Sequence, residues 1–216
     1  MASLNFNTIQ APVSGHYIRP GYAGLSIEWS SASPAWLHPT GEVNQAVMQL
    51  VSNLAESGEF RVRIGGATED IIWWAPESKT QLNHSSVPPK QPKKIVRPAT
   101  STISINSATL ETYATLGNHV PGLKYILGVS QGSTDKNVNG HEAVVFVRDG
   151  ILKSSLANKI NCLELGNEPE FFSLEGLRNK SVYNPARDFP AEWLSVANAL
   201  KSAVGSSLPL GGPATN

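Results

Sequence analysis

The 216-residue chain has one cysteine, no long hydrophobic run and no excess of charge of either sign. Because Cys162 is the only cysteine, an internal disulfide framework and a cysteine-rich metal motif are excluded. No run approaches the roughly 18 apolar residues of a transmembrane helix, so we expect no membrane span. The 17 basic and 17 acidic side chains cancel, which argues against nucleic acid or an anionic membrane as a partner.

Two further absences concern cofactors and targeting. The histidines share no metal-ligand spacing, and no glycine-rich phosphate loop follows a predicted strand, so we expect neither a metal nor a nucleotide cofactor. Residues 1–7 lack both a basic segment and an apolar segment, so no secretory signal peptide is expected. The sequence leaves the cellular location open.

The pattern of apolar residues predicts one α/β domain. Short apolar runs alternate with longer amphipathic stretches, which is typical of strand–helix units around a parallel sheet. The expected strands are residues 22–29, 60–64, 123–129, 160–165 and the start of a fifth at 208–210. The expected helices are residues 43–55, 108–119, 142–158 and 190–204.

One segment, residues 73–102, fits no such unit and is rich in proline, serine and lysine. A loop of this length in a compact domain is either functional or disordered. Its cluster of Lys90, Lys93, Lys94 and Arg97 could attract an acidic sugar, although a solvated basic loop is the more ordinary interpretation.

The most informative motif is Asn167-Glu168-Pro169, directly behind the apolar run at 160–165. A carboxyl at the mouth of a parallel sheet is partly desolvated, which raises its pKa toward the range where it can protonate a glycosidic oxygen. Asn167 supplies an amide that can hold a sugar hydroxyl, and Pro169 ends the strand. The combination favours a glycosidase proton donor at Glu168 over a surface carboxylate.

Two other motifs precede it in order, Gly24-Leu25-Ser26-Ile27-Glu28 and the segment from Arg61 to Asp70. Together the three resemble the retaining glycosidases built on a (β/α)8 TIM barrel, and more narrowly glycoside hydrolase family 79, the family of β-glucuronidases and heparanase. The likeness runs from about residue 22 to residue 213. It implies an incomplete barrel in residues 1–216, covering about the first four to five strand–helix units, and a glucuronide or related glycoside as substrate.

The resemblance also implies roles for individual residues. Glu168 would be the general acid/base, and Asn167 would hold the 2-hydroxyl of the sugar. Glu28 would contact sugar hydroxyls. Gly65 and Gly66 would let the backbone approach the sugar.

Two positions near the glycine pair complete the expected binding site. Asp70 matches an acidic residue of the family, so we expect it to take part in substrate binding. Several relatives carry a polar side chain directly after the glycine pair, where this chain has Ala67. We expect Thr68 to replace that contact.

The chain also departs from the family in length. Retaining hydrolysis needs two carboxyl groups roughly 5 Å apart, and in the family the nucleophilic glutamate comes from the seventh strand. This chain ends at Asn216, before a sixth strand, so the nucleophile, the C-terminal half of the barrel and the family's β-sandwich are absent from it. We therefore expect a fragment that needs a complementing C-terminal half. Family members are often secreted or lysosomal.

Two alternatives stay open. The chain could be a non-catalytic carbohydrate-binding remnant. It could also be an unrelated α/β domain, which would leave the Asn-Glu-Pro motif unexplained.

Within the sheet, we expect Glu164 to point inward and pair with Arg61 or Arg63. The indoles of Trp29, Trp73 and Trp74 could stack on a sugar or pack loops onto the barrel.

Overall fold

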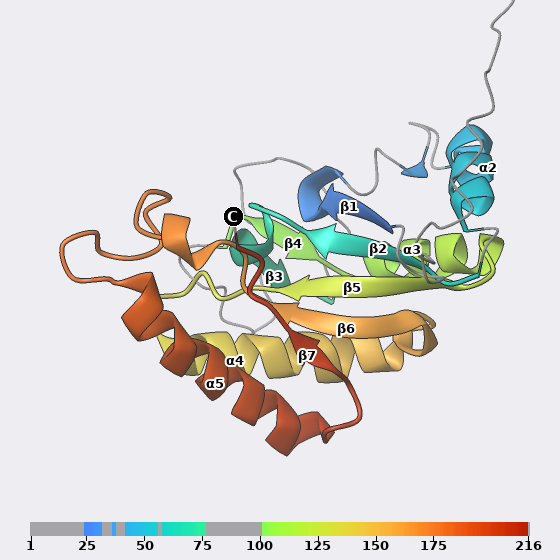
Figure 1. Cartoon of the computed structure of the whole chain (residues 1–216). Helices are drawn as coiled ribbons and strands as arrows, with labels where there is room; N and C mark the ends of the chain where they lie inside the picture. The colour runs from blue at the N-terminus through green and yellow to red at the C-terminus, as the bar shows by residue number, and fades with distance from the viewer. Residues whose placement is uncertain (1–23, 32–35, 38–41, 56–57, 77–100, 216) are drawn as a thin grey trace, which may run out of the picture.

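The computed structural model describes residues 24–31, 36–37, 42–55, 58–76 and 101–215, and it has a mixed α/β fold. Five parallel strands form one sheet in the order β1-β2-β5-β6-β7. They are β1 (Gly24–Glu28), β2 (Phe60–Gly65), β5 (Leu123–Val129), β6 (Ile160–Leu165) and β7 (Leu210–Gly211). Arrows β2, β5 and β6 point to the left in Figure 1, so the carboxyl ends of the parallel strands share one edge. A separate parallel pair joins β3 (Ile72–Trp74) to β4 (Ile103–Ile105).

Four α-helices accompany the sheet in the described part of the chain. They are α2 (Gln45–Leu54), α3 (Ser107–His119), α4 (Lys136–Val145) and α5 (Pro185–Val204). Figure 1 shows α4 and α5 side by side along the β6–β7 end of the sheet. Shorter helical turns are η1 (Trp29–Ser31), η2 (Glu69–Ile71), η3 (Phe146–Gly150), η4 (Ile151–Lys153), η5 (Ala157–Lys159) and η6 (Pro169–Phe171). None of the helices in the described residues is both long and apolar enough to cross a membrane.

The helices cover one face of the sheet, as the alternation along β2 shows. Phe60, Val62 and Ile64 are buried in one cluster with apolar side chains of all four α-helices. The intervening Arg61 and Arg63 are only half-buried. Because successive side chains of a strand point to opposite faces, the two arginines belong to the other, polar face. Glu164 on β6 lies on the same face and pairs with Arg63, one of its two expected partners.

Most of the expected elements are present, and two helices begin earlier than expected. β5 and β6 have the expected bounds. The fourth expected helix starts at Pro185 because Asn184 caps it and proline is tolerated in a first helical turn. The third starts at Lys136, where Asp135 accepts a hydrogen bond from the amide of Asn137. Its polar first turns carry no apolar periodicity, so the pattern located only the last turn of α4. The expected end at residue 158 is wrong, because α4 ends at Val145 and the short turns η3, η4 and η5 follow it.

The expected long loop at 73–102 is wrong at its start, whereas its expected end agrees with the start of β4 at Ile103. Trp73 and Trp74 belong to β3, which pairs with β4, and residues 77–100, with the expected lysine cluster and Arg97, lie outside the described residues. Trp73 and Trp74 are only 3% and 2% exposed, and the indole N–H of Trp29 donates to the carbonyl of Gly128. All three indoles therefore pack within the fold.

The early start of α5 can be tested at its N-cap. The Oδ1 atom of Asn184 accepts a hydrogen bond from the amide of Arg187 at 3.2 Å. Asn184→Ala should lower the free energy of unfolding by about 1 kcal/mol, because the Arg187 amide loses its side-chain acceptor and keeps only the carbonyl of residue 184. Urea denaturation measures the change. Asn184→Ser retains a capping oxygen and should stay near wild type, and equal loss in both variants would contradict the assignment.

Candidate active site

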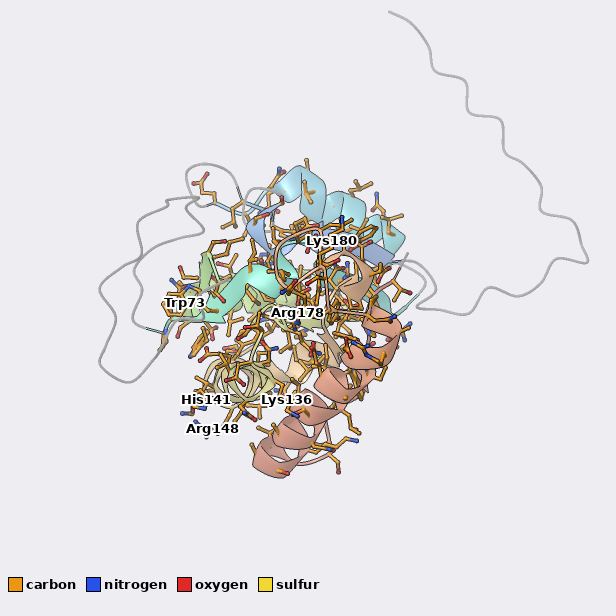
Figure 2. All side chains as sticks on the ribbon, turned by 90° about the vertical axis from the view of Figure 1, so that its left-hand side faces the viewer. Trp73, Lys136, His141, Arg148, Arg178 and Lys180 are labelled. Carbon is orange, nitrogen blue, oxygen red and sulfur yellow. The ribbon has the colours of Figure 1, made fainter. Side chains whose placement is uncertain are left out.

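The carboxyl ends of neighbouring strands bring the expected site residues to one edge of the sheet. They come from the end of β1, the segment after β2 and the segment after β6, and are Glu28, Gly65, Gly66, Thr68, Asp70, Asn167 and Glu168. Figure 2 looks onto this edge, with Arg178 near the middle of the view and Trp73 to one side. In open parallel sheets ligands bind at this end of the strands.

Glu168 has the most unusual backbone of the site. Its φ is 46° and its ψ 58°, and it is the only residue other than glycine with a positive φ in the described part of the chain. Holding a side-chain-bearing residue in such a conformation costs on the order of 1–3 kcal/mol. The amide of Glu168 donates to the carbonyl of Ala214 at 2.7 Å, and its carbonyl accepts from the amide of Phe171. Such strain is concentrated at functional sites.

The Asn167 side chain is oriented by an arginine from the neighbouring part of the sheet. Arg63 Nη2 donates to Asn167 Oδ1 at 2.8 Å, and Arg63 Nε donates to Glu164 Oε2 at 2.5 Å. Because the amide oxygen is taken by Arg63, the amide nitrogen must face the other way. It lies 3.5 Å from Glu168 Oε2. Asn167 therefore presents a donor beside the Glu168 carboxylate.

The glycine turn after β2 encloses the Glu28 carboxylate. Glu28 accepts hydrogen bonds from the amides of Ala67 (3.0 Å) and Thr68 (2.8 Å), and from the Thr68 hydroxyl (2.6 Å). Gly66 has a φ of 74°, and a Cβ there would lie only 2.0 Å from Glu28 Oε1. The turn thus needs glycine to let Glu28 approach, and the hydroxyl that was expected to meet a sugar donates to Glu28.

Asp70 lies beneath the site and is 2% exposed. Its two oxygens accept from the amides of Gln131 (2.7 Å) and Asn167 (3.0 Å). Burial raises the pKa of Asp70 to about 7, and the two amides oppose the rise. This geometry gives Asp70 a different place from the expected one, because it clamps the loops after β5 and β6 through their backbone and offers a substrate almost no surface.

Arg178 is a second clamp, which no sequence pattern indicated. Its guanidinium donates to the carbonyls of Gln131 (2.9 Å) and Gly132 (3.3 Å) and pairs with Glu192 at 2.7 Å. It also lies over the ring of Phe172, 5.0 Å from the centroid. Arg178 therefore joins the loop after β5 to the chain that follows Glu168. Its partners come from three separate segments, so the sequence alone gave no signal.

The sequence analysis did not identify Glu175 either. Desolvation raises its pKa, and the charges of Glu168 and Glu28 add to the rise. Glu175 therefore lies within electrostatic reach of both Glu168 and Glu28. Across the described ranges, no group of His, Cys, Asp or Glu side chains is arranged to hold a metal ion.

Comparison with known proteins gives similarities in structure and none in sequence. No protein-family model and no curated protein sequence matches the chain. A similar solved structure is described as a novel 4-O-α-L-rhamnosyl-β-D-glucuronidase from Fusarium oxysporum 12S in a Rha-GlcA complex, with 18% sequence identity and a TM-score of 0.61. The match covers 92% of this chain and 38% of that one. At this identity the likeness shows a shared fold, and this chain spans well under half the length of the glucuronidase.

The Glu28 cluster predicts the effect of removing one hydroxyl. Thr68→Val keeps the shape of the side chain but leaves one Glu28 oxygen without its 2.6 Å partner. We expect the free energy of unfolding to fall by about 1 kcal/mol, since a hydrogen bond to a partly exposed carboxylate is lost. Chemical denaturation measures it. Thr68→Ser should recover most of the loss, and a fully stable Thr68→Val would show that the hydroxyl is not needed.

The Asp70 clamp predicts a pH dependence. Its pKa is raised in the folded state, so its contribution to stability is present at low pH and is lost as pH rises through about 7. Asp70→Asn should remove this part of the slope. It should also lower the free energy of unfolding by about 1–3 kcal/mol at mildly acidic pH, because one buried amide then faces an amide donor.

A surface aspartate provides the control for Asp70→Asn. Hydrogen bonds from Arg148 and Lys153 lower the pKa of Asp149 to about 2, which is the opposite direction. Asp149→Asn should leave the slope between about pH 5.5 and pH 8 unchanged, since Asp149 stays ionised there in both states. Thermal unfolding across this range distinguishes the two. A wild-type slope in Asp70→Asn would contradict the clamp.

Proposed function

We propose that the chain is part of a retaining glycoside hydrolase that acts on β-linked glucuronides, with Glu168 as its general acid/base. The observation that carries the proposal is the strained backbone of Glu168 at the carboxyl end of β6, next to an Asn167 amide held in one orientation by Arg63. A proton donor must be fixed relative to the glycosidic oxygen, and strain that is stabilised by its surroundings provides such fixation.

The other carboxylates of the site are less suited to this role. Both oxygens of Glu28 are occupied by the amides of the glycine turn and by the Thr68 hydroxyl. Asp70 is buried under the loops. Glu168 is half-buried, and its carboxylate meets the side-chain amide of Asn167 only at the long distance of 3.5 Å. Of these groups, Glu168 therefore has the carboxyl best placed to meet a substrate oxygen.

The proposed barrel and nucleophile extend beyond the described sheet. β1 and β7 stand at the two ends of the strand order, and further strands pairing with them would close a (β/α)8 barrel. The second carboxyl group would come from one of those strands, roughly 5 Å from Glu168. The structural likeness to a 4-O-α-L-rhamnosyl-β-D-glucuronidase supports a glucuronide as the sugar to test first.

Hydrolysis of an aryl β-D-glucuronide tests the proposal, both with the chain alone and with a complementing C-terminal barrel half supplied. Glu168→Gln should reduce turnover by at least about 100-fold, because general acid catalysis typically contributes that much. Asn167→Ala should weaken binding of the sugar as well as turnover. Glu170→Gln, two residues away on η6, serves as the matched control and should retain activity.

Three outcomes separate the candidate functions. Turnover that survives Glu168→Gln rules out the acid/base assignment. Saturable calorimetric binding of glucuronic acid without hydrolysis, even with the second half present, supports the carbohydrate-binding alternative. A folded chain that neither binds nor hydrolyses glucuronides contradicts both functions.

A further inference from the structure

Two glycines at the carboxyl edge of the sheet leave a niche that a single side chain fills. Gly65 ends β2, and Gly128 lies near the end of the adjacent β5. A Cβ atom would lie 2.6 Å from Glu69 Oε2 at Gly65 and 2.2 Å at Gly128. Side-chain-bearing residues could not stand at these positions without displacing Glu69. The sheet is therefore built around the Glu69 carboxyl group.

This carboxyl group is fully enclosed. Glu69 is 0% exposed, and within the described residues neither of its oxygens has a partner in hydrogen-bonding geometry. The nearest positive group is Arg63, with Nη2 at 3.7 Å from Glu69 Oε2. Arg63 already donates from Nε to Glu164 and from Nη2 to Asn167. An ionised Glu69 would be a fully buried anion whose nearest counter-charge lies 3.7 Å away, and this is strongly unfavourable.

The charges around Glu69 also favour its protonated form. Burial raises the pKa of Glu69 well above its usual value, and the negative charges of Asp70 and Glu164 raise it further. The Arg63 guanidinium and the Gly166 amide oppose the rise. One arginine thus faces several carboxyl groups. When Glu69 carries a proton and is neutral, the positive charge of Arg63 is neutralised by the negative charge of Glu164.

We propose that Glu69 is a protonated, neutral carboxylic acid that acts as a positioning residue for the site. It fills the space beside the Arg63 guanidinium without competing for it, so that Arg63 stays hydrogen-bonded to Asn167 and fixes the amide beside Glu168. The consequence for a sugar rests on the proposed function. The protonation and the Asn167 orientation do not, and both can be measured without a ligand.

The protonation is tested by infrared spectroscopy of the full chain. The difference spectrum of wild type minus Glu69→Gln at about pH 6 should contain the carbonyl band of a protonated carboxylic acid. A carboxylate band in its place would overturn the proposal. Glutamine keeps the shape and neutrality of the protonated acid, so the variant is expected to fold.

The positioning is tested by NMR of the side-chain amide of Asn167, assigned by the loss of its signal in Asn167→Asp. Glu69→Ala should shift this amide, because Arg63 can move into the emptied niche. Glu69→Gln should return the amide to its wild-type position. Glu164→Gln, which removes the ion-pair partner of Arg63, should shift it as well.

The half-buried Glu142 on α4 offers a control. Burial also raises the pKa of Glu142 to about 7, but Glu142 lines a separate small cavity with Trp73 and Trp74. Glu142→Gln should leave the Asn167 amide unmoved. An unmoved amide in Glu69→Ala, or a Glu69→Gln variant displaced as far as Glu69→Ala, would overturn the positioning role. If Glu69→Ala does not fold, the infrared band and the position of the amide in Glu69→Gln decide the question.

Calorimetry with glucuronic acid separates this inference from the proposed function. Failure of wild type and Glu69→Gln alike to bind the sugar would count against the function, and the infrared and NMR results would stand. Wild-type affinity in Glu69→Gln, with weakened binding in Glu69→Ala, would support both. Loss of binding in Glu69→Gln alone would contradict the proposal that Glu69 is neutral.

Discussion

The charge of Arg63 has to be balanced at the carboxyl edge of the sheet, and the geometry of the site depends on how this is achieved. Its guanidinium contacts Ser26 on β1 and both Glu164 and Asn167 on β6 or directly after it. A buried ion pair contributes little net stability once desolvation is counted, but its hydrogen-bond directions are specific. The arginine consequently determines which end of the Asn167 amide faces Glu168. The glycines of the neighbouring strands leave room for Glu69 beside it.

The loops at this edge are held mainly through their backbones. Asp70 accepts amide hydrogen bonds from the loops after β5 and β6, and Arg178 donates to carbonyls of the β5 loop. Ala214, beyond β7, accepts from the amide of Glu168 itself. These contacts come from three different parts of the chain, so no single loop has to stabilise the left-handed conformation of Glu168. The proposed role of Glu168 as a proton donor would require a rigid frame of this kind, because small displacements cost much of a catalytic group's effect.

The carboxyl groups of the site divide into distinct physical roles. Glu28 shapes a turn, Asp70 clamps two loops, and Glu69 fills a niche, while Glu168 follows β6 with a half-buried side chain on a left-handed backbone. Their environments differ because each meets a different number of amide donors and a different degree of burial. The fold is shared with a glucuronidase of which the match covers only 38%.

The sequence alone determined the strands and helices with strong periodicity, the parallel sheet, and the gathering of Glu28, the glycine pair and Asn167-Glu168 at one edge. Local patterns suffice for these features, because strand ends in a parallel sheet necessarily meet. It missed β3 and β4, the capped starts of α4 and α5, and the roles of Arg178 and Glu175. Only the tertiary structure decided which carboxylates are buried or bound, because burial and charge partners arise between residues far apart in the chain. Glu69 and Asp70 are adjacent acids in the sequence. Only the packing of β2, β5 and β6 around them places Glu69 in a niche and brings two amide donors to Asp70.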